Sequence, residues 1–222
     1  MMRFAVSIMA KAPRAGEVKT RLCPPLSTGE AAELYRCFLL DKIEQVGALK
    51  KASAAIAYTP DDGRPFFEEF APGFLLIPQR GADLGFRLAN NFEQLLAQGY
   101  TGALAIDSDT PTLPTHFLEQ ALDLMTTPEI DLVLGPSDDG GYYLIGLRKL
   151  YRELFEAMAW STADVIPETI RRAETMGLNV ASLPLWFDVD TAEDLNRLKA
   201  SLDSAHADAA PHTRRFFKER AA

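Results

Sequence analysis

Hydrophobic and polar positions follow two different spacings along this chain. Short, nearly continuous apolar runs are typical of buried strands. Such runs lie at residues 4–8, 54–58, 74–77, 103–106, 131–135, 142–145 and 180–185. Between them, apolar residues recur every three or four positions, a spacing that predicts helices. The predicted helices span residues 28–46, 84–98, 114–127, 163–176 and 192–202.

The alternation of strands and helices predicts the fold class. Right-handed crossovers place such helices on both faces of a mainly parallel sheet. We therefore expect a single α/β domain over residues 1–203, a three-layer α/β/α sandwich with a Rossmann-like sheet. The sixth strand follows a tight turn at Gly140–Gly141 and is open to antiparallel pairing. Residues 204–222 form a tail that we expect to fray, unless Phe216 and Phe217 dock on the body or on a partner.

Composition and charge narrow the class of partner. The 222 residues are 47% hydrophobic and 24% charged, as in ordinary globular proteins, and the net charge is −8. This acidic balance argues against binding to nucleic acid or to an anionic membrane. No run approaches the roughly 18 apolar residues of a membrane span, and the two cysteines lack metal-binding spacing. We expect a cytoplasmic protein, with the oligomeric state, a homodimer included, left open.

A basic loop follows the first predicted strand. The first 21 residues hold five basic side chains and one acidic one. The loop contains Lys11, Arg14, Gly16, Lys19 and Arg21. Because ligands of open α/β sheets bind where strands end, we interpret this loop as a cradle for a polyphosphate rather than as a solvated charge cluster. It is not a P-loop, since Val18 stands where that motif has a glycine before the lysine.

Two acidic side chains, Asp107 and Asp109, follow the fourth predicted strand. Burying such a pair without compensation would cost several kcal/mol. A divalent cation would offset that cost, because Mg²⁺ binds one or two carboxylates together with phosphate oxygens. The simpler interpretation is that one Asp caps the next helix and the other is solvated. A haloacid-dehalogenase-type phosphatase, with Asp107 as nucleophile and Asp109 as acid and base, is disfavoured because Pro111 stands where that family has threonine or valine.

A second acidic pair, Asp188 and Asp190, follows the last predicted strand. Thr191 and Asp194 predict a helix cap there, and Asp190 would favour the helix dipole without any ligand. Asp188 has no such local role. We therefore take both residues of the pair as candidate ligands of the same Mg²⁺ (or Mn²⁺) ion.

Three further segments are weaker candidates. Asp83 follows the third strand and is a candidate contact to the base or sugar of a nucleotide. The tight turn at Gly140–Gly141 is typical of a hairpin, yet it would also let a ligand approach the backbone closely. Trp160 and Ser161 precede a predicted helix, where such residues are usually a buried side chain and a helix cap. The candidate acceptor-binding residues in these last two segments are Gly140, Gly141, Tyr142, Trp160 and Ser161.

Taken together, these segments resemble one group of proteins. The resemblance rests on residues 11–22, 107–111, 139–143 and 188–195, in this order. It points to the nucleotide-diphospho-sugar transferase superfamily, which has the glycosyltransferase-A fold. Within that superfamily the chain is most similar to bacterial glycosyltransferase-like proteins related to 2-phospho-L-lactate guanylyltransferase. One departure is that the first loop keeps only Gly16, where molybdenum-cofactor guanylyltransferases and sugar-nucleotide pyrophosphorylases are glycine-rich.

The resemblance implies a Mg²⁺-dependent transferase that uses a nucleotide or nucleotide sugar and a small-molecule acceptor. In glycosyl transfer, Asp139 is the candidate base, and the metal stabilises the departing nucleoside diphosphate. In nucleotidyl transfer, which is the alternative, Lys19 and Arg21 neutralise a triphosphate while the acceptor displaces pyrophosphate. A non-catalytic nucleotide-binding protein is a third interpretation, which the joint presence of the basic loop and both acidic pairs disfavours.

Overall fold

The computed structural model describes residues 3–204 and 209–221. Its strands are β1 (Phe4–Lys11), β2 (Ala52–Thr59), β3 (Leu75–Pro78), β4 (Gly102–Ile106), β5 (Leu132–Pro136), β6 (Tyr142–Leu147) and β7 (Val180–Ser182). Its α-helices are α1 (Thr28–Gly47), α2 (Arg64–Phe70), α3 (Leu84–Ala97), α4 (Thr115–Met125), α5 (Val165–Thr175), α6 (Ala192–Ser204) and α7 (Pro211–Ala221). Short 3₁₀ helices are η1 (Thr20–Leu22), η2 (Asp61–Gly63) and η3 (Arg152–Leu154).

Within the described residues, seven strands form one sheet in the order β3-β2-β1-β4-β6-β5-β7. All neighbouring strands pair in parallel except β6, which is antiparallel to both β4 and β5. The predicted fold class is therefore confirmed. The strand order reverses at β1, because the chain first moves outward to β3 and then returns to place β4 on the other side of β1. Ligands of such sheets bind at this reversal, at the carboxyl ends of the strands.

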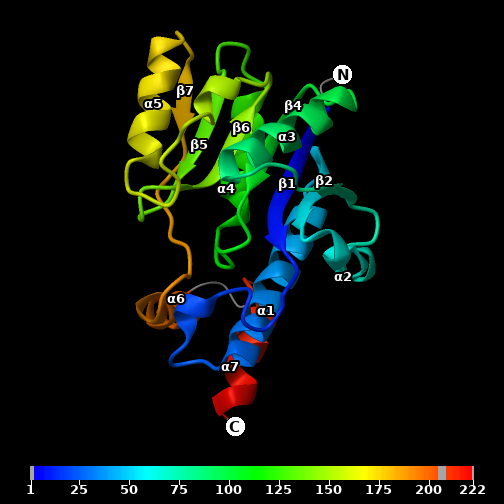
Figure 1. The fold of residues 1–222 in the computed structure, drawn as a ribbon, viewed down its shortest axis with the longest axis vertical. Coiled ribbons are helices and arrows are strands. Elements are labelled where there is room, and N and C mark those ends of the chain that lie inside the picture. The colour runs from blue at the N-terminus through cyan, green and yellow to red at the C-terminus, as the bar shows by residue number, and fades with distance from the viewer. Residues whose placement is uncertain (1–2, 205–208, 222) are drawn as a thin grey trace.

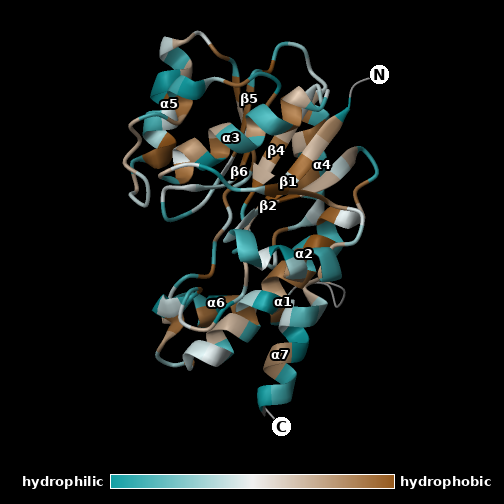
Figure 2. Cartoon of the chain, turned by 45° about the vertical axis from the view of Figure 1, so that its right-hand side comes forward, coloured by the Kyte–Doolittle hydropathy of each residue, from teal (hydrophilic) through white to brown (hydrophobic). Residues whose placement is uncertain are grey.

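Two hydrophobic cores lie on opposite faces of the sheet (Figure 1). One core contains Phe38 of α1 and Leu118 of α4, and it extends to α2, α6 and α7. The other contains Phe92 of α3 and reaches α5. Ala5 and Val6 are neighbours in β1 and point to different cores, as the alternation along a strand requires. Figure 2 shows the central strands in hydrophobic brown. None of the described helices combines the length and the apolar character needed to cross a bilayer.

The predicted starts of α1 and α6 are confirmed at atomic detail. Ser27 and Glu30 form a reciprocal capping box, in which each side chain accepts the backbone N–H of the other residue at 3.3 and 2.7 Å. Thr191 and Asp194 form the same arrangement at α6. Helix α2, by contrast, is not predicted by the sequence pattern, because its seven residues are too few to show a helical period.

The C-terminal tail forms a docked helix, which corrects the expectation of a frayed terminus. Helix α7 packs on α1, where the buried carboxylate of Asp41 accepts the backbone N–H groups of His212 at 2.8 Å and Thr213 at 3.0 Å. Phe216 is buried in the same core as α1. Asp41 is 171 residues away from His212 in sequence, so no local pattern of the tail could reveal this cap. Residues 205–208 lie outside the described residues.

Replacing Asp41 tests this docking. Asp41→Ala leaves the first N–H groups of α7 without their acceptor, and a lost helix cap costs about 1–2 kcal/mol. We expect the free energy of unfolding in urea to fall by about that amount, and to fall less in Asp41→Asn, which keeps an acceptor oxygen. Glu44→Ala is the matched control, because the Glu44 carboxylate meets α7 only at the ring of His212. An unchanged urea midpoint in Asp41→Ala would contradict the docking.

Candidate functional site

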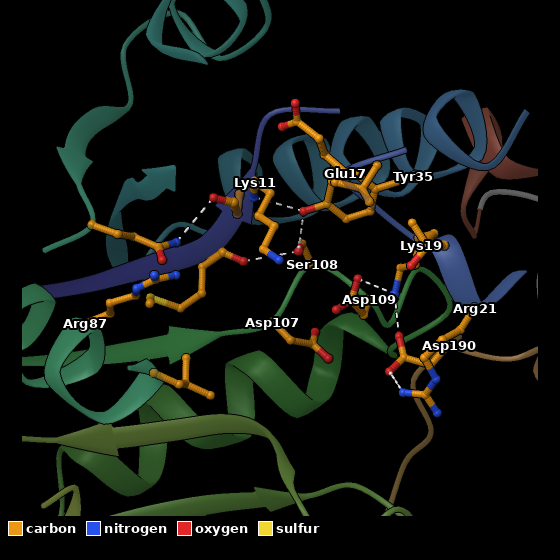
Figure 3. Close-up of a pocket in the computed structure, with 16 residues that line it drawn as sticks. Lys11, Glu17, Lys19, Arg21, Tyr35, Arg87, Asp107, Ser108, Asp109 and Asp190 are labelled. Atoms are coloured by element: carbon orange, nitrogen blue, oxygen red, sulfur yellow. Dashed lines mark hydrogen bonds and ion pairs between the residues drawn. The ribbon is translucent and has the colours of Figure 1, made fainter. Parts of the chain in front are cut away.

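A cleft of about 420 Å³ opens at the carboxyl ends of β1 and β4, where the strand order reverses (Figure 3). Its charged lining residues are Lys11, Glu17, Lys19, Arg21, Arg87, Asp107, Asp109 and Asp190. Figure 3 shows Lys19, Arg21 and Asp190 at one side of the view and Arg87 at the opposite side. The lining also includes the apolar side chains of Met9 and Leu84. The cleft therefore offers charged groups at both sides together with a smaller apolar surface.

Lys19 connects the charged end of the cleft. Its ammonium group lies 2.5 Å from Asp109 Oδ1 and 2.8 Å from Asp190 Oδ1, and its side chain is only 5% exposed. Arg21 pairs with the other oxygen of Asp190 at 3.2 Å. Burial lowers the pKa of Lys19, but the two carboxylates outweigh burial and raise the pKa above its ordinary value. A charged lysine therefore stands where two acidic segments converge.

The floor of the cleft is fixed by Tyr35, which reaches it from α1. The buried Tyr35 hydroxyl accepts the backbone N–H of Lys11 at 3.0 Å and lies 2.9 Å from Ser108 Oγ. Ser108 donates its own hydrogen to Met9 O at 3.1 Å, so the Tyr35 hydroxyl is the donor to Ser108. These bonds join the end of β1 to the loop after β4. They set the position of Asp107 and Asp109 relative to the basic loop.

Asp107 lines the cleft from the same loop. Its Oδ1 accepts a hydrogen bond from Thr110 Oγ1 at 2.6 Å. Burial raises the pKa of Asp107, the nearby Lys42 acts against that rise, and the charge of Asp109 adds to it. An additional cation at the cleft would stabilise the ionised carboxylate.

The donor set fits a divalent cation that a substrate helps to hold. Asp109 and Asp190 approach one point, where the Lys19 ammonium lies. Among the described residues, no cluster of three or more His, Cys, Asp or Glu side chains could hold a metal by itself. Mg²⁺ commonly uses only one or two carboxylates and takes its other ligands from water and substrate phosphates. Asp109 and Asp190 would hold such an ion, and Asp107, which lines the same cleft, is a further candidate ligand.

The structure separates the two members of the second predicted pair. Asp190 lines the cleft, whereas Asp188 accepts a hydrogen bond from Ser137 Oγ at 3.1 Å and is not part of the lining. Burial, together with the carboxylates of Asp139 and Asp190, raises the pKa of Asp188 to about 6. Asp139 accepts the backbone N–H of Gly141 in its own turn at 2.8 Å and also lies outside the lining.

Other residues of the predicted nucleotide site have different partners. Arg14 forms an ion pair with Asp62 at 2.9 Å and does not line the cleft. Gly16 is exposed and has φ +80°, a backbone conformation that favours glycine, so it turns the loop. Asp83 caps α3 by accepting the backbone N–H of Phe86 at 2.9 Å. The members of the predicted set that line the cleft are Lys11, Lys19 and Arg21.

The predicted acceptor-binding residues lie outside the cleft lining. Gly140 has φ +92°, and a Cβ at this position would approach Ala163 Cα to 2.4 Å. Tyr142 packs against Trp160 in an edge-on arrangement, with ring centroids 6.3 Å apart. Ser161 is exposed just before α5. Packing of the turn against Ala163 accounts for Gly140, and packing of the two rings against each other accounts for Tyr142 and Trp160.

The sequence analysis misses the cleft residues Tyr35 and Arg87 because both lie inside predicted helices. Tyr35 resembles an ordinary core residue of α1, although its hydroxyl organises the cleft floor. Arg87 resembles an exposed polar residue of α3. It lies in the first turn of a helix that follows a strand end, and this position is the signal that could have identified it. Arg87 donates to Gly81 O at 3.3 Å and forms no ion pair with the described residues.

Comparison with known proteins places the chain in a family. Residues 42–162 match the model of the family described as "Uncharacterized protein conserved in bacteria (DUF2064)". The chain belongs to this family. A crystal structure from Desulfovibrio desulfuricans G20, described as a "putative nucleotide-diphospho-sugar transferase", is 32% identical to this DUF2064 protein, with a TM-score of 0.89. The match covers 99% of this chain and 95% of that one, and it confirms the resemblance to nucleotide-diphospho-sugar transferases that the sequence motifs indicate.

More distant structures share the fold of this DUF2064 protein. CMP:2-keto-3-deoxy-manno-octonic acid synthetase, complexed with CTP, is 13% identical with a TM-score of 0.59, and the match covers 90% of this chain and 98% of that one. Glucosyl-3-phosphoglycerate synthase from Mycobacterium tuberculosis, in complex with Mn²⁺, UDP and glucosyl-3-phosphoglycerate, is 15% identical with a TM-score of 0.51, over 90% and 76% of the two chains. No curated protein matches the sequence.

The buried carboxylate of Asp188 predicts a pH-dependent stability. Its pKa in the folded protein, about 6, lies above the ordinary value of 3.8, so the folded state holds the extra proton between these values. The free energy of unfolding therefore falls as the pH rises through this window, and the ionised Asp188 destabilises the fold at pH 7. We expect Asp188→Asn to raise the free energy of unfolding at pH 7 by roughly 1–2 kcal/mol, and to change it little near pH 4.

Urea denaturation at the two pH values measures this effect. Asp203→Asn, which removes an exposed carboxylate of α6, is the control for a general loss of negative charge. A gain in Asp188→Asn that is equal at both pH values, or shared by the control, would contradict the role of buried charge.

Proposed function

We propose that this DUF2064 protein is a metal-dependent glycosyltransferase, which transfers a sugar from a nucleotide sugar to a small-molecule acceptor. The observation that carries the proposal is the charged end of the cleft, where Lys19 meets Asp109 and Asp190 at the reversal of the sheet. The description of the Desulfovibrio relative as a nucleotide-diphospho-sugar transferase supports the same reaction class.

A diphosphate with a bound divalent cation fits the charged end, because the diphosphate can replace the carboxylates and the cation can replace the lysine in the existing ion pairs. Its oxygens would accept charge-assisted hydrogen bonds from Lys19 and Arg21. The carboxylates of Asp109 and Asp190, released from Lys19, would then hold a divalent cation that the diphosphate also contacts. The nucleoside would extend along the less charged lining toward Leu84. Positive and negative charge stay paired throughout this exchange.

The residues of the charged end have a direct role in the proposed transfer. The bond between the anomeric carbon of the sugar and the diphosphate oxygen breaks, and a bond to the acceptor oxygen forms. Negative charge then develops on the departing diphosphate, which Lys19 and Arg21 would stabilise. A bound divalent cation would supply further stabilisation of that charge. The proton of the acceptor hydroxyl passes to the departing diphosphate and from there to solvent, and we assign Asp139 no role in accepting it, since Asp139 lies outside the cleft lining.

Nucleotidyl transfer is the second candidate function. It is favoured by the number of cations in the cleft, because Lys11 and Arg87 line it and form no ion pairs with the described residues. These side chains could bind the additional charge of a triphosphate. The acceptor oxygen would then attack the α-phosphorus and pyrophosphate would leave. The fold shared with a synthetase that was crystallised with CTP is compatible with this chemistry.

Thermal unfolding with a ligand panel separates the two functions. The panel contains nucleoside triphosphates and nucleotide sugars, each with and without Mn²⁺. A ligand at a hundred times its dissociation constant stabilises the native state by about 2.7 kcal/mol. A metal-dependent shift with a nucleotide sugar supports glycosyl transfer, and a shift with a triphosphate alone supports nucleotidyl transfer. The absence of any shift would contradict both.

Lys19→Met tests the phosphate contact. The variant loses a charge-assisted hydrogen bond, and such bonds contribute about 1.5–3 kcal/mol. We expect it to bind the active nucleotide roughly ten- to a hundredfold more weakly by calorimetry. Binding of the corresponding nucleoside should remain unchanged. Arg14→Met is the control, because Arg14 belongs to the same loop but pairs with Asp62 outside the cleft. Equal losses for nucleotide and nucleoside would indicate a collapsed loop instead.

Asp109→Asn tests the metal contact. The substitution removes the charge that a divalent cation needs but keeps the shape of the side chain. We expect the Mn²⁺-dependent part of the ligand-induced thermal shift, and turnover of the donor found in the panel, to disappear. The melting temperature without ligand should change little, since Lys19 keeps its ion pair with Asp190. A variant that retains full Mn²⁺-dependent turnover would exclude Asp109 as a ligand.

A further inference from the structure

A second lysine lies behind the cleft. Lys42 of α1 is buried, with 1% of its surface exposed, and it does not line the cleft. Its ammonium group donates to the backbone oxygen of Thr110 at 2.9 Å and to Thr110 Oγ1 at 3.0 Å. No carboxylate of the described residues forms an ion pair with it. A buried ammonium without a direct counter-ion is costly, so its presence calls for a physical reason.

The hydrogen bonds of Thr110 have a fixed direction. A hydroxyl group carries one hydrogen, and an ammonium group can only donate. Thr110 Oγ1 therefore accepts from Lys42 and gives its own hydrogen to Asp107 Oδ1, 2.6 Å away. One hydroxyl group thus links the ammonium of Lys42 by two hydrogen bonds to the carboxylate of Asp107, which lines the cleft.

Attachment of the loop to α1 does not require this charge. One turn further along α1, Gln45 donates its neutral amide to the backbone oxygen of Leu113, in the same loop, at 2.6 Å. A glutamine or a similar neutral donor at position 42 could hold the Thr110 carbonyl in the same way. What the ammonium adds is charge, and that charge acts on Asp107 and Asp109.

We infer that Lys42 is a positioning residue for cation binding: through Thr110 it orients the carboxylate of Asp107, which lines the cleft and would join Asp109 at the ion. This inference rests on the proposed function, because it requires that the cleft binds a divalent cation. Lys42 and Lys19 then have different roles. Lys19 occupies the point between two carboxylates and is exchangeable, whereas Lys42 is enclosed and remains in place when a ligand enters.

Binding of Mn²⁺ alone, measured from the electron paramagnetic resonance signal of the free ion, tests the inference without an activity assay. Partners that orient a ligating group typically contribute ten- to a hundredfold in metal affinity. We expect Lys42→Met and Thr110→Val each to raise the dissociation constant of Mn²⁺ by roughly ten- to a hundredfold. Thr110→Ser, which keeps the hydroxyl, should bind like the wild type. Arg36→Met is the matched control, since it removes a positive charge from the same helix that is paired only with Glu33.

Stability measurements distinguish positioning from a structural role. Lys42→Met removes a buried charge but also two hydrogen bonds to Thr110, and because these losses act on stability in opposite directions we expect its melting temperature to stay near that of the wild type while Mn²⁺ binding weakens. If Lys42→Met does not fold, the comparison of Thr110→Val with Thr110→Ser decides the question. Wild-type affinity in Thr110→Val, or in a folded Lys42→Met, would overturn the inference and leave the proposed function intact. A wild-type protein that binds no Mn²⁺, with or without nucleotides, would overturn both.

Discussion

The ammonium group of Lys19 joins three segments that are distant in the sequence. It connects the loop after β1 to Asp109 after β4 and to Asp190 after β7. The backbone already holds the two acidic segments together, because Val189 N donates to Asp109 O at 3.0 Å. Their carboxylates therefore lie close whether or not a cation is present, and without one they would repel each other. The fold at this end of the sheet requires a positive charge between them, and Lys19 supplies it.

Much of the fold follows from local sequence features. The apolar runs predict the strands because residues buried on both faces of a sheet must be apolar. Ser27 and Thr191 predict helix starts because their side chains satisfy N–H groups of their own helix. The elements missing from the prediction depend on distant contacts. Helix α7 is positioned by Asp41, and the short helix α2 contributes Phe67 to a core that other elements complete.

The candidate site was predictable in type but not in detail. Repulsion between neighbouring carboxylates is visible in the sequence, so the acidic pairs could be predicted as candidate cation ligands, a prediction that stays open. Which of the candidate residues line the cleft depends on partners that only the folded chain brings together. Asp188 accepts a hydrogen bond from Ser137, and Arg14 forms an ion pair with Asp62. Lys42 shows the limit most clearly, because a lysine in a helix ordinarily indicates an exposed face.

The two lysines offer a physical account of how a cleft with several carboxylates could accept the proposed anionic ligand. A site with only carboxylates would repel a phosphate, and a site whose carboxylates were all permanently paired would have none to offer to a metal. Lys19 lines the cleft from the loop after β1, so a bound phosphate could replace the carboxylates as its partner. Lys42, by contrast, is enclosed by α1 and the Thr110 loop. The site thus pairs a lysine that lines the cleft with one enclosed behind it, and this arrangement would suit a ligand that brings a phosphate and a cation together.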